Sequence, residues 1–159
     1  MSNWYQIFYD EIYNNEYIKE FTTINDFPEN IFGFIYCIRN KETNKIYVGK
    51  KQIMSNINKK LGKKEIALLP IQRGRKVTKK KITKESDWVN YWGSSKPLLK
   101  EINEIGKDKF EREILLIVNT KKELTYWELA YQIKYDVLRV NSFNESVLGR
   151  YFTKDFKYD

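Results

Sequence analysis

Residues 33–52 read GFIYCIRNKETNKIYVGKKQ. Two segments within them, 34–39 and 45–50, are rich in β-branched and aromatic residues and alternate with a period of two, which is typical of strands. The polar residues between the two segments suit a tight turn. The sequence therefore predicts a β-hairpin at this place.

The alternation separates this hairpin into two faces. If Arg39 pairs with Asn44, Tyr36 lies directly opposite Tyr47, and their side chains share one face. Two neighbouring phenols are more than packing requires, so this face is a candidate site. The other face is expected to contact the core and carries Ile35, Cys37, Ile46 and Val48.

The rest of the chain predicts an α+β fold. The apolar segment 110–118 is expected to form a third, central strand. Ser95 is placed to cap a helix that ends at Gly106, and Thr120 begins a capping box that opens another helix. We therefore expect one domain with a small three-stranded antiparallel sheet flanked by helices, since 159 residues suffice for a single core.

The segments around the hairpin differ in composition. Residues 1–30 are acidic and aromatic, and their spacing predicts an amphipathic helix that packs on the domain. A segment that mimics DNA phosphates and covers a basic surface is the alternative. The expected main domain spans residues 31–150, with a long basic insertion at 53–84 in which residues 63–69 could form a short helix and the rest reads as a mobile loop. Residues 151–159 form a tail without an assigned function.

Composition excludes several classes of protein. The chain has no histidine, which rules out Ser-His-Asp triads, histidine-dependent zinc sites and HNH-type nucleases, so acid–base chemistry must come from Tyr, Lys, Glu or Asp. No apolar run approaches the roughly 18 residues of a membrane span, and the N-terminus lacks the features of a signal peptide. A single cysteine, Cys37, forms no internal disulfide. We expect a cytoplasmic protein with a buried, reduced cysteine.

Positive charge is concentrated in one stretch. The formal net charge is +8, yet residues 45–84 hold fourteen Lys and Arg against one Glu, and residues 1–30 carry a net charge of −5. A solvated loop without a role is one interpretation, but such a charge density beside the tyrosine hairpin favours contacts with DNA phosphates. The expected DNA-binding residues are Lys50, Lys51, Arg73, Arg75, Lys76, Lys79, Lys80 and Lys81.

Glu128 is a carboxylate that helix formation does not explain. It follows Leu124 by four residues, so it points near the buried side of its helix, where a carboxylate is costly unless a cation or hydrogen bonds satisfy it. From the spacing alone, a salt-bridged helix glutamate is the simpler interpretation. Glu123, by contrast, has a structural role as a helix cap.

These residues together resemble the GIY-YIG nuclease family. Phe34-Ile35-Tyr36, ten further residues and Tyr47-Val48-Gly49 correspond to the two motif triplets, with Phe34 in place of the first glycine. Residues 91–95, 102–106 and 110–115 resemble stretches of phage-type members. The resemblance covers residues 32–150.

The resemblance implies the roles of individual residues. Tyr36 and Tyr47 take the places of the two tyrosines at the reaction centre, where one deprotonates or positions water. Glu128 takes that of the helix glutamate that holds one divalent metal, Mg²⁺ or Mn²⁺. Asn144, with Asn141 as an alternative, corresponds to an asparagine that supports the site.

One family residue has no counterpart in the sequence. Family members carry an arginine on the first helix after the hairpin, where it contacts the phosphate, but residues 50–60 contain no arginine. Lys59 or Lys60 lies at about the expected distance, although Lys lacks the bidentate fork of Arg. Arg73 or Arg75 of the basic insertion is the other candidate.

The resemblance implies a metal-dependent DNA endonuclease of phage or mobile-element type that cuts or nicks DNA in a homing-type reaction, and the basic charge and the paired tyrosines are compatible with this function. A free tyrosine has a pKa near 10, and Lys50, Lys51 and a metal-held phosphate nearby are expected to favour the ionised form of the phenol. Two other functions remain open. One is a non-catalytic nucleic-acid-binding module on the same fold, and the other is a protein–protein adaptor that uses the acidic N-terminus.

Overall fold

The computed structural model describes residues 2–70 and 73–156. The chain divides into two compact units. The first comprises the residues up to Ile53 and those from Asp87 onward, and the second comprises Met54–Ser86. The residue bounds of the second unit nearly match those of the expected basic insertion, residues 53–84. Each unit is described by itself.

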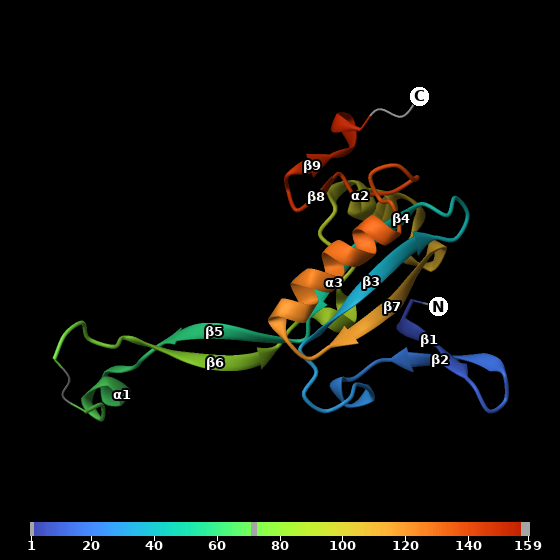
Figure 1. Cartoon of the computed structure of the whole chain (residues 1–159). Helices are drawn as coiled ribbons and strands as arrows, with labels where there is room; N and C mark the ends of the chain where they lie inside the picture. The colour runs from blue at the N-terminus through green and yellow to red at the C-terminus, as the bar shows by residue number, and fades with distance from the viewer. Residues whose placement is uncertain (1, 71–72, 157–159) are drawn as a thin grey trace. The chain divides into compact units, whose positions relative to one another are not determined.

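The first unit is built on a five-stranded sheet with the strand order β2-β1-β7-β3-β4 (Figure 1). The predicted three antiparallel strands are β7, β3 and β4, and the α+β class is confirmed. The predicted size of the sheet is wrong, because β1 joins β7 in parallel and brings β2 with it. The strands are β1 (Trp4–Asp10), β2 (Asn15–Phe21), β3 (Gly33–Asn40), β4 (Ile46–Gln52) and β7 (Phe110–Val118).

The two additional strands come from the segment in which a helix was expected. Asp10 ends β1 and its carboxylate accepts hydrogen bonds from the backbone N–H groups of Ile12 and Tyr13 (2.9 and 3.2 Å). Asn14 then adopts a positive φ of 52°, which Asn tolerates better than most residues. The turn interrupts the apolar spacing after seven residues, and the aromatic side chains before it suit a strand.

The central hairpin has a different register from the predicted one. Tyr36 pairs with Gly49, and Tyr47 pairs with Ile38. The turn lies one residue further along the chain than expected, because Asn40 pairs with Lys45 (2.9 Å) and its side chain accepts hydrogen bonds from two turn N–H groups. The register shift amounts to two residues, so Tyr36 and Tyr47 still share a face although they are not directly opposite.

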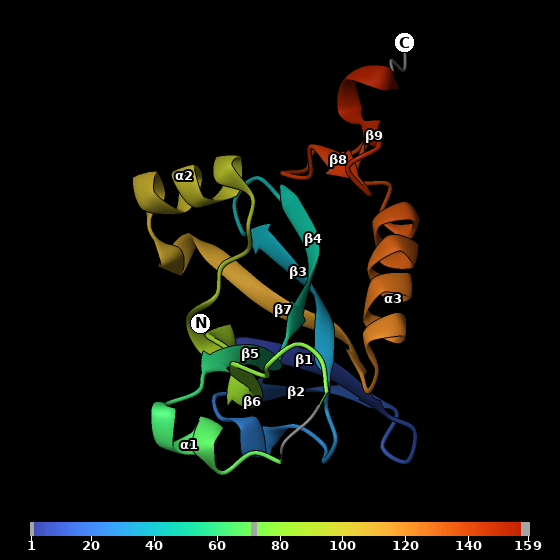
Figure 2. The ribbon, with the colours of Figure 1, turned by 90° about the vertical axis from the view of Figure 1, so that its left-hand side faces the viewer.

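Two helices enclose this sheet from opposite sides (Figure 2). They are α2 (Lys96–Ile105) and α3 (Lys121–Lys134). Both predicted caps are confirmed, since Ser95 Oγ accepts from the N–H of Leu98 (3.3 Å) and Thr120 Oγ1 accepts from that of Glu123 (3.2 Å). Helix α3 packs on the apolar face of the hairpin, where Cys37 is buried as a free thiol with a pKa that burial raises to about 12.

Short elements complete the first unit. They are η1 (Ile24–Asp26), η2 (Trp88–Asn90), η3 (Lys107–Lys109), β8 (Ser146–Val147), β9 (Tyr151–Phe152) and η4 (Thr153–Asp155). The expected tail thus begins with β9 and η4, while residues 157–159 lie outside the described part of the chain. Among the described residues, no helix combines the length and the apolar character that crossing a membrane requires.

An aromatic cluster fills the face of the sheet opposite α3. The Trp4 ring lies 5.0 Å from that of Phe34 and 5.2 Å from that of Tyr36, measured between centroids. Trp4 also donates a hydrogen bond from its Nε1 to the backbone oxygen of Trp88 (2.7 Å). Because Trp4 is only 1% exposed, the N-terminal hairpin is an integral part of the core.

The second unit contains the expected short helix, but a two-stranded antiparallel ribbon stands where most of the rest was expected to be a loop. It consists of β5 (Met54–Lys60), α1 (Lys63–Ala67) and β6 (Lys79–Glu85). Sequence patterning missed the strands because lysines and asparagines, which strands disfavour, outnumber the β-branched residues. Ile57 and Ile82 form a cross-strand apolar pair, which helps to fix the register.

The burial of Trp4 leads to a stability prediction. Trp4→Ala should lower the free energy of unfolding by about 3–5 kcal/mol, because it removes a large buried side chain together with its hydrogen bond. Tyr13→Ala, in the turn of the same hairpin where the side chain is 76% exposed, should change it by less than about 0.5 kcal/mol. Urea denaturation measures both values. Equal, small effects would mean that the hairpin is an appendage and not part of the core.

Candidate active site

The two motif tyrosines lie next to each other on one face of the sheet. Their ring centroids are 6.0 Å apart, and a third ring, that of Tyr91, lies 6.0 Å from Tyr36. Tyr36 is 1% exposed, whereas Tyr47 is half-buried and its hydroxyl forms a hydrogen bond with Ser94 Oγ (3.0 Å). Tyr47 is therefore the phenol that reaches solvent, and Tyr36 lies behind it.

Gly49 makes this arrangement possible. The register places it across from Tyr36, and a Cβ atom at Gly49 would lie 2.6 Å from the Tyr36 hydroxyl oxygen and 2.8 Å from the ring carbon that bears it. Such distances are too short for any side chain. The glycine of the second motif triplet is thus required by the close approach of the Tyr36 ring to the backbone of β4.

A pocket of about 570 Å³ opens beside Tyr47. Strand β4 is the edge of the sheet, so Tyr47 on one face and Glu128 of α3 on the other can line the same pocket. The residues that line it are Tyr47, Ser94, Ser95, Lys96, Glu128, Gln132, Phe143, Asn144, Glu145, Ser146, Leu148 and Gly149. The structure therefore brings together three of the predicted site residues, Tyr47, Glu128 and Asn144.

Glu128 has the environment expected of a salt-bridged helix glutamate and also that expected of a carboxylate at a candidate metal site. Its carboxylate oxygen lies 3.7 Å from Lys50 Nζ, and its side chain is 23% exposed. Burial raises the pKa of the carboxyl group, and the charge of Lys50 lowers it to a lesser extent. Glu128 is thus salt-bridged and at the same time lines the pocket at a cost in desolvation.

Asn144 holds the edge strand in place. Its Oδ1 accepts a hydrogen bond from the N–H of Val48, and its Nδ2 donates one to the Val48 oxygen (both 2.9 Å). Gln132 Nε2 donates to the same oxygen (3.1 Å). Asn141 contributes its backbone oxygen to the N–H of Ile46 (3.3 Å), and its side chain is exposed. Of the two candidate asparagines, Asn144 is the one whose side chain supports the site.

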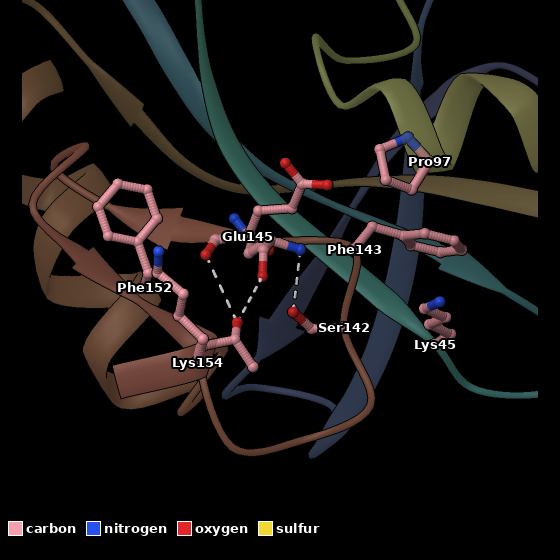
Figure 3. Close-up of a pocket in the computed structure, with 9 residues that line it drawn as sticks. Lys45, Pro97, Ser142, Phe143, Glu145, Phe152 and Lys154 are labelled. Carbon is pink, nitrogen blue, oxygen red and sulfur yellow. Dashed lines mark hydrogen bonds between the residues drawn. The ribbon is translucent and has the colours of Figure 1, made fainter. Parts of the chain in front are cut away.

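A second pocket, of about 470 Å³, shares a wall with the first. Figure 3 shows the hydrogen bonds that fix this wall. The N–H of Asn144 donates to Ser142 Oγ (3.0 Å), and Thr153 Oγ1 lies 3.5 Å from the backbone oxygens of Asn144 and Glu145. Since neither Tyr47 nor Glu128 lines the second pocket, the candidate chemistry belongs to the first.

Burial raises the pKa of both motif tyrosines. Tyr36 has a pKa well above its usual value, first because it is buried and then because Tyr47 and Tyr91 are close. The pKa of Tyr47 is raised by burial, which the hydrogen bond with Ser94 partly offsets. Both phenols are therefore neutral at ordinary pH in the protein as described.

In the free protein the neighbouring lysines alone do not favour ionisation of these tyrosines, and the expected effect of lysines together with a metal-held phosphate stays a prediction. Lys50 pairs with Glu128, and Lys51 Nζ lies 2.5 Å from Asp87 Oδ1 and 3.9 Å from the centre of the Tyr91 ring. Carboxylates thus compensate both positive charges. Desolvation outweighs the field of the lysines, and the ionised phenol is not favoured.

The remaining predicted residues belong to the second unit. Lys60 lies on β5, Lys79, Lys80 and Lys81 lie on β6, and Arg73, Arg75 and Lys76 lie between α1 and β6. All seven side chains are exposed. Their roles, and the choice between Lys60 and Arg75 for the missing arginine, stay predictions.

Sequence reasoning missed Lys96, Ser94 and Gln132. Lys96 is the one cation among the described residues that line the pocket, and it is the first residue of α2. The signal was present, because the predicted cap at Ser95 already placed the following residue at a helix N-terminus. Gln132, one turn after Glu128 on α3, could have been found from the same helical spacing.

The donor set limits which metal ions the site could hold. Within residues 2–70 and 73–156, no group of three or more His, Cys, Asp or Glu side chains is arranged to bind a metal. A dedicated all-protein cage is therefore absent from this part of the chain. Mg²⁺ commonly binds through one or two carboxylates, water and substrate phosphates, and Glu128 in an open pocket fits that mode.

The comparisons with known proteins agree with this geometry. Residues 16–154 match the family described as "Putative endonuclease segE, GIY-YIG domain". Neither the curated proteins nor the solved structures gave a match. The matched segment includes both motif tyrosines, Glu128 and Asn144 and covers well over half of the chain. The chain belongs to this GIY-YIG endonuclease family.

Proposed function

We propose that the protein is a metal-dependent DNA endonuclease that hydrolyses phosphodiester bonds. The main support is the meeting of Tyr47 and Glu128 in one pocket at the edge strand, with Lys96 on the pocket wall. Phosphodiester hydrolysis needs an oriented water, positive charge at the phosphate and help for the leaving oxygen. The resemblance to phage-type members extends the proposal to homing-type cutting or nicking.

Each pocket residue has a role in this proposal. In this proposal the Tyr47 hydroxyl, oriented by Ser94, first releases its proton to solvent when a substrate phosphate and a cation are present. The resulting phenolate positions the attacking water and accepts its proton as the new oxygen–phosphorus bond forms and the bond from phosphorus to the leaving oxygen breaks. Tyr36 packs behind Tyr47 and fixes the direction of its ring. Asn144 keeps β4, and with it Tyr47, in place through Val48.

Glu128 would hold the divalent ion, Mg²⁺ or Mn²⁺. When bound, the ion supplies positive charge that stabilises the phosphate and the departing oxygen. Lys50 now compensates the carboxylate charge and would be released to the substrate phosphates. The raised pKa values of the free protein mean that Tyr47 is a base only when positive charge and substrate are present.

Lys96 supplies the cation that the sequence comparison with the family left open. It lines the pocket together with Tyr47 and Glu128, and it begins a helix, whose N-terminus favours anions. Its ammonium group is exposed. We assign Lys96 the contact with a non-bridging phosphate oxygen of the scissile group.

Nicking of a supercoiled plasmid tests the proposal directly. The purified full-length protein should convert supercoiled plasmid to the open-circular or linear form when Mg²⁺ is added, and EDTA should stop the reaction. Salt-sensitive DNA binding without any cleavage would select a non-catalytic binding module instead. Absence of both activities would contradict the proposal altogether.

Removing the negative charge of Glu128 or the hydroxyl group of Tyr47 should abolish or slow DNA nicking and leave DNA binding intact. Glu128→Gln keeps the shape of the side chain but loses the charge that holds a divalent ion, so magnesium-dependent nicking should disappear. Tyr47→Phe removes one hydroxyl, and the rate should fall by about 10²–10⁴-fold. Single-turnover nicking rates at saturating Mg²⁺ measure both effects.

Tyr36→Phe is the matched control, since it removes the buried phenol of the pair. It should slow nicking less than Tyr47→Phe does. All three variants should bind DNA in EDTA like the parent. Parental nicking by a folded Glu128→Gln protein would refute the metal assignment, and a larger effect at Tyr36 than at Tyr47 would reverse the roles of the tyrosines.

Lys96→Ala should reduce the rate of cleavage by roughly 10²–10³-fold, a usual cost for losing one group that stabilises transition-state charge. Lys96→Arg should restore most of the rate. The control is Lys100→Ala one turn later on α2, where the side chain is 79% exposed and pairs with Glu104. A parental rate in Lys96→Ala, or an equal loss in Lys100→Ala, would remove Lys96 from the site.

The buried position of Glu128 predicts a pH-dependent cost in stability. The pKa of Glu128 is raised above its ordinary value of 4.5 in the folded protein. Below about pH 4 both folded and unfolded states are protonated at this group, so parent and Glu128→Gln should be equally stable. As the pH rises through 4.5 and then through the folded pKa, the parent should become the less stable protein.

Urea denaturation midpoints at pH 4 and pH 7 check this prediction. At pH 7, the Glu128→Gln protein should unfold at a higher urea concentration than the parent. A less stable variant would show that the ion pair with Lys50 outweighs burial and that the role of Glu128 is structural.

A further inference from the structure

The second unit carries the chain's whole excess of positive charge. Met54–Ser86 contain eleven Lys and Arg against two Glu, a net charge of +9, so the remainder of the chain has a net charge of −1. A polyanion is therefore attracted to this unit first. The distribution of side chains over the two faces of this unit determines which groups can contact such a partner.

The β5–β6 ribbon has two chemically different faces. Its register pairs Asn56 with Thr83 and Asn58 with Lys81, and residues directly opposite each other share a face. We call this face the polar face. It comprises Asn56, Asn58, Lys60, Lys79, Lys81 and Thr83, all of which are exposed, and at one end the pair of Met54 and Glu85.

The opposite face serves the folding of the ribbon itself. It holds the apolar pair of Ile57 and Ile82. It also holds Ser55, Lys59, Lys84 and Lys80. Lys80 Nζ lies 2.9 Å from a carboxylate oxygen of Glu65 in α1. On the polar face, Thr83 Oγ1 donates a cross-strand hydrogen bond to Asn56 Oδ1 (3.3 Å). Its amide and ammonium groups are thus displayed on a surface that the pairing of the ribbon does not require.

We propose that this ribbon enters the major groove of duplex DNA and reads base edges with its polar face. The major groove admits a two-stranded β-ribbon, and Asn, Lys and Thr are side chains that recognise adenine, guanine and the thymine methyl group there. Seven residues per strand span about 24 Å, the length of roughly seven base pairs. The inference rests on the proposed function in taking DNA as the partner, and it adds base recognition.

Phosphate contacts fall to basic residues away from the polar face. Arg73, Arg75 and Lys76 lie between α1 and β6, outside the ribbon pairs, and are exposed. Phosphate contacts position a protein on DNA, and base contacts specify the sequence. The two groups of residues should therefore affect two separate properties of binding.

The test is selection of bound duplexes from a randomised pool by the full-length protein in EDTA, where no cleavage occurs. The parent should enrich a preferred sequence. Asn56→Ala combined with Asn58→Ala should reduce the ratio of specific to non-specific affinity by at least about tenfold, because each lost base contact costs roughly five- to hundredfold. The slope of log affinity against log salt should stay unchanged.

Two control variants separate readout from folding and from charge. Ser55→Ala lies on the opposite face, across from Lys84, and should keep the preference. The combined Arg73→Ala, Arg75→Ala and Lys76→Ala variant should flatten the salt slope by roughly two to three units without changing the preferred sequence.

Several results would overturn the inference. They are a parent without sequence preference, a preference that survives the double asparagine variant, an equal loss in Ser55→Ala, and tighter binding to single-stranded DNA or to RNA than to duplex DNA. Because binding is measured without metal, selective binding by a protein that fails to nick plasmid would refute the nuclease proposal and keep this one. Nicking of plasmid by a protein that shows no preference for a DNA sequence would support the nuclease proposal and refute the inference of base recognition.

Discussion

The site depends on how the free edge of β4 is satisfied. An edge strand leaves backbone N–H and C=O groups without partners, and burying them unpaired costs about 1–3 kcal/mol each. At Val48 the Asn144 amide supplies both a donor and an acceptor, as a neighbouring strand would. The edge therefore stays open to the pocket although its backbone is paired. Tyr47 from one face and Glu128 from the other can then line the same space.

Burial of the side chains around this pocket also determines their charge states. Burial raises the pKa values of Tyr36, Tyr47 and Glu128, while Lys50 and Lys51 are each held by a carboxylate. The free protein thus keeps its phenols neutral and its charges compensated. A bound phosphate with a cation would reverse the balance by favouring ionised groups. In the proposed enzyme, such a site would stay chemically inactive until the substrate binds, which would limit unwanted reactions.

Much of this could be predicted from local sequence patterns. The hairpin, the central strand 110–118 and the caps at Ser95 and Thr120 each follow from side chains within a few positions of one another, and the structure contains all of them. The errors arise where local patterns are ambiguous. Aromatic spacing in residues 1–30 suits either a helix or a strand, and the parallel pairing with β7 that decides between them is not local. The register of the hairpin depended on the side chain of Asn40.

The basic insertion was the hardest part to predict, and its structure changes how its charge is understood. A lysine-rich loop can only attract DNA, whereas paired strands impose a fixed alternation of side chains on two faces. That alternation places Asn56, Asn58 and Thr83 on one side and the Ile57–Ile82 pair on the other. Cross-strand lysines such as Lys60 and Lys79 repel each other in a free ribbon. A bound polyanion would relieve this repulsion, so the ribbon that we propose as the DNA-reading element should be more stable in the complex than alone.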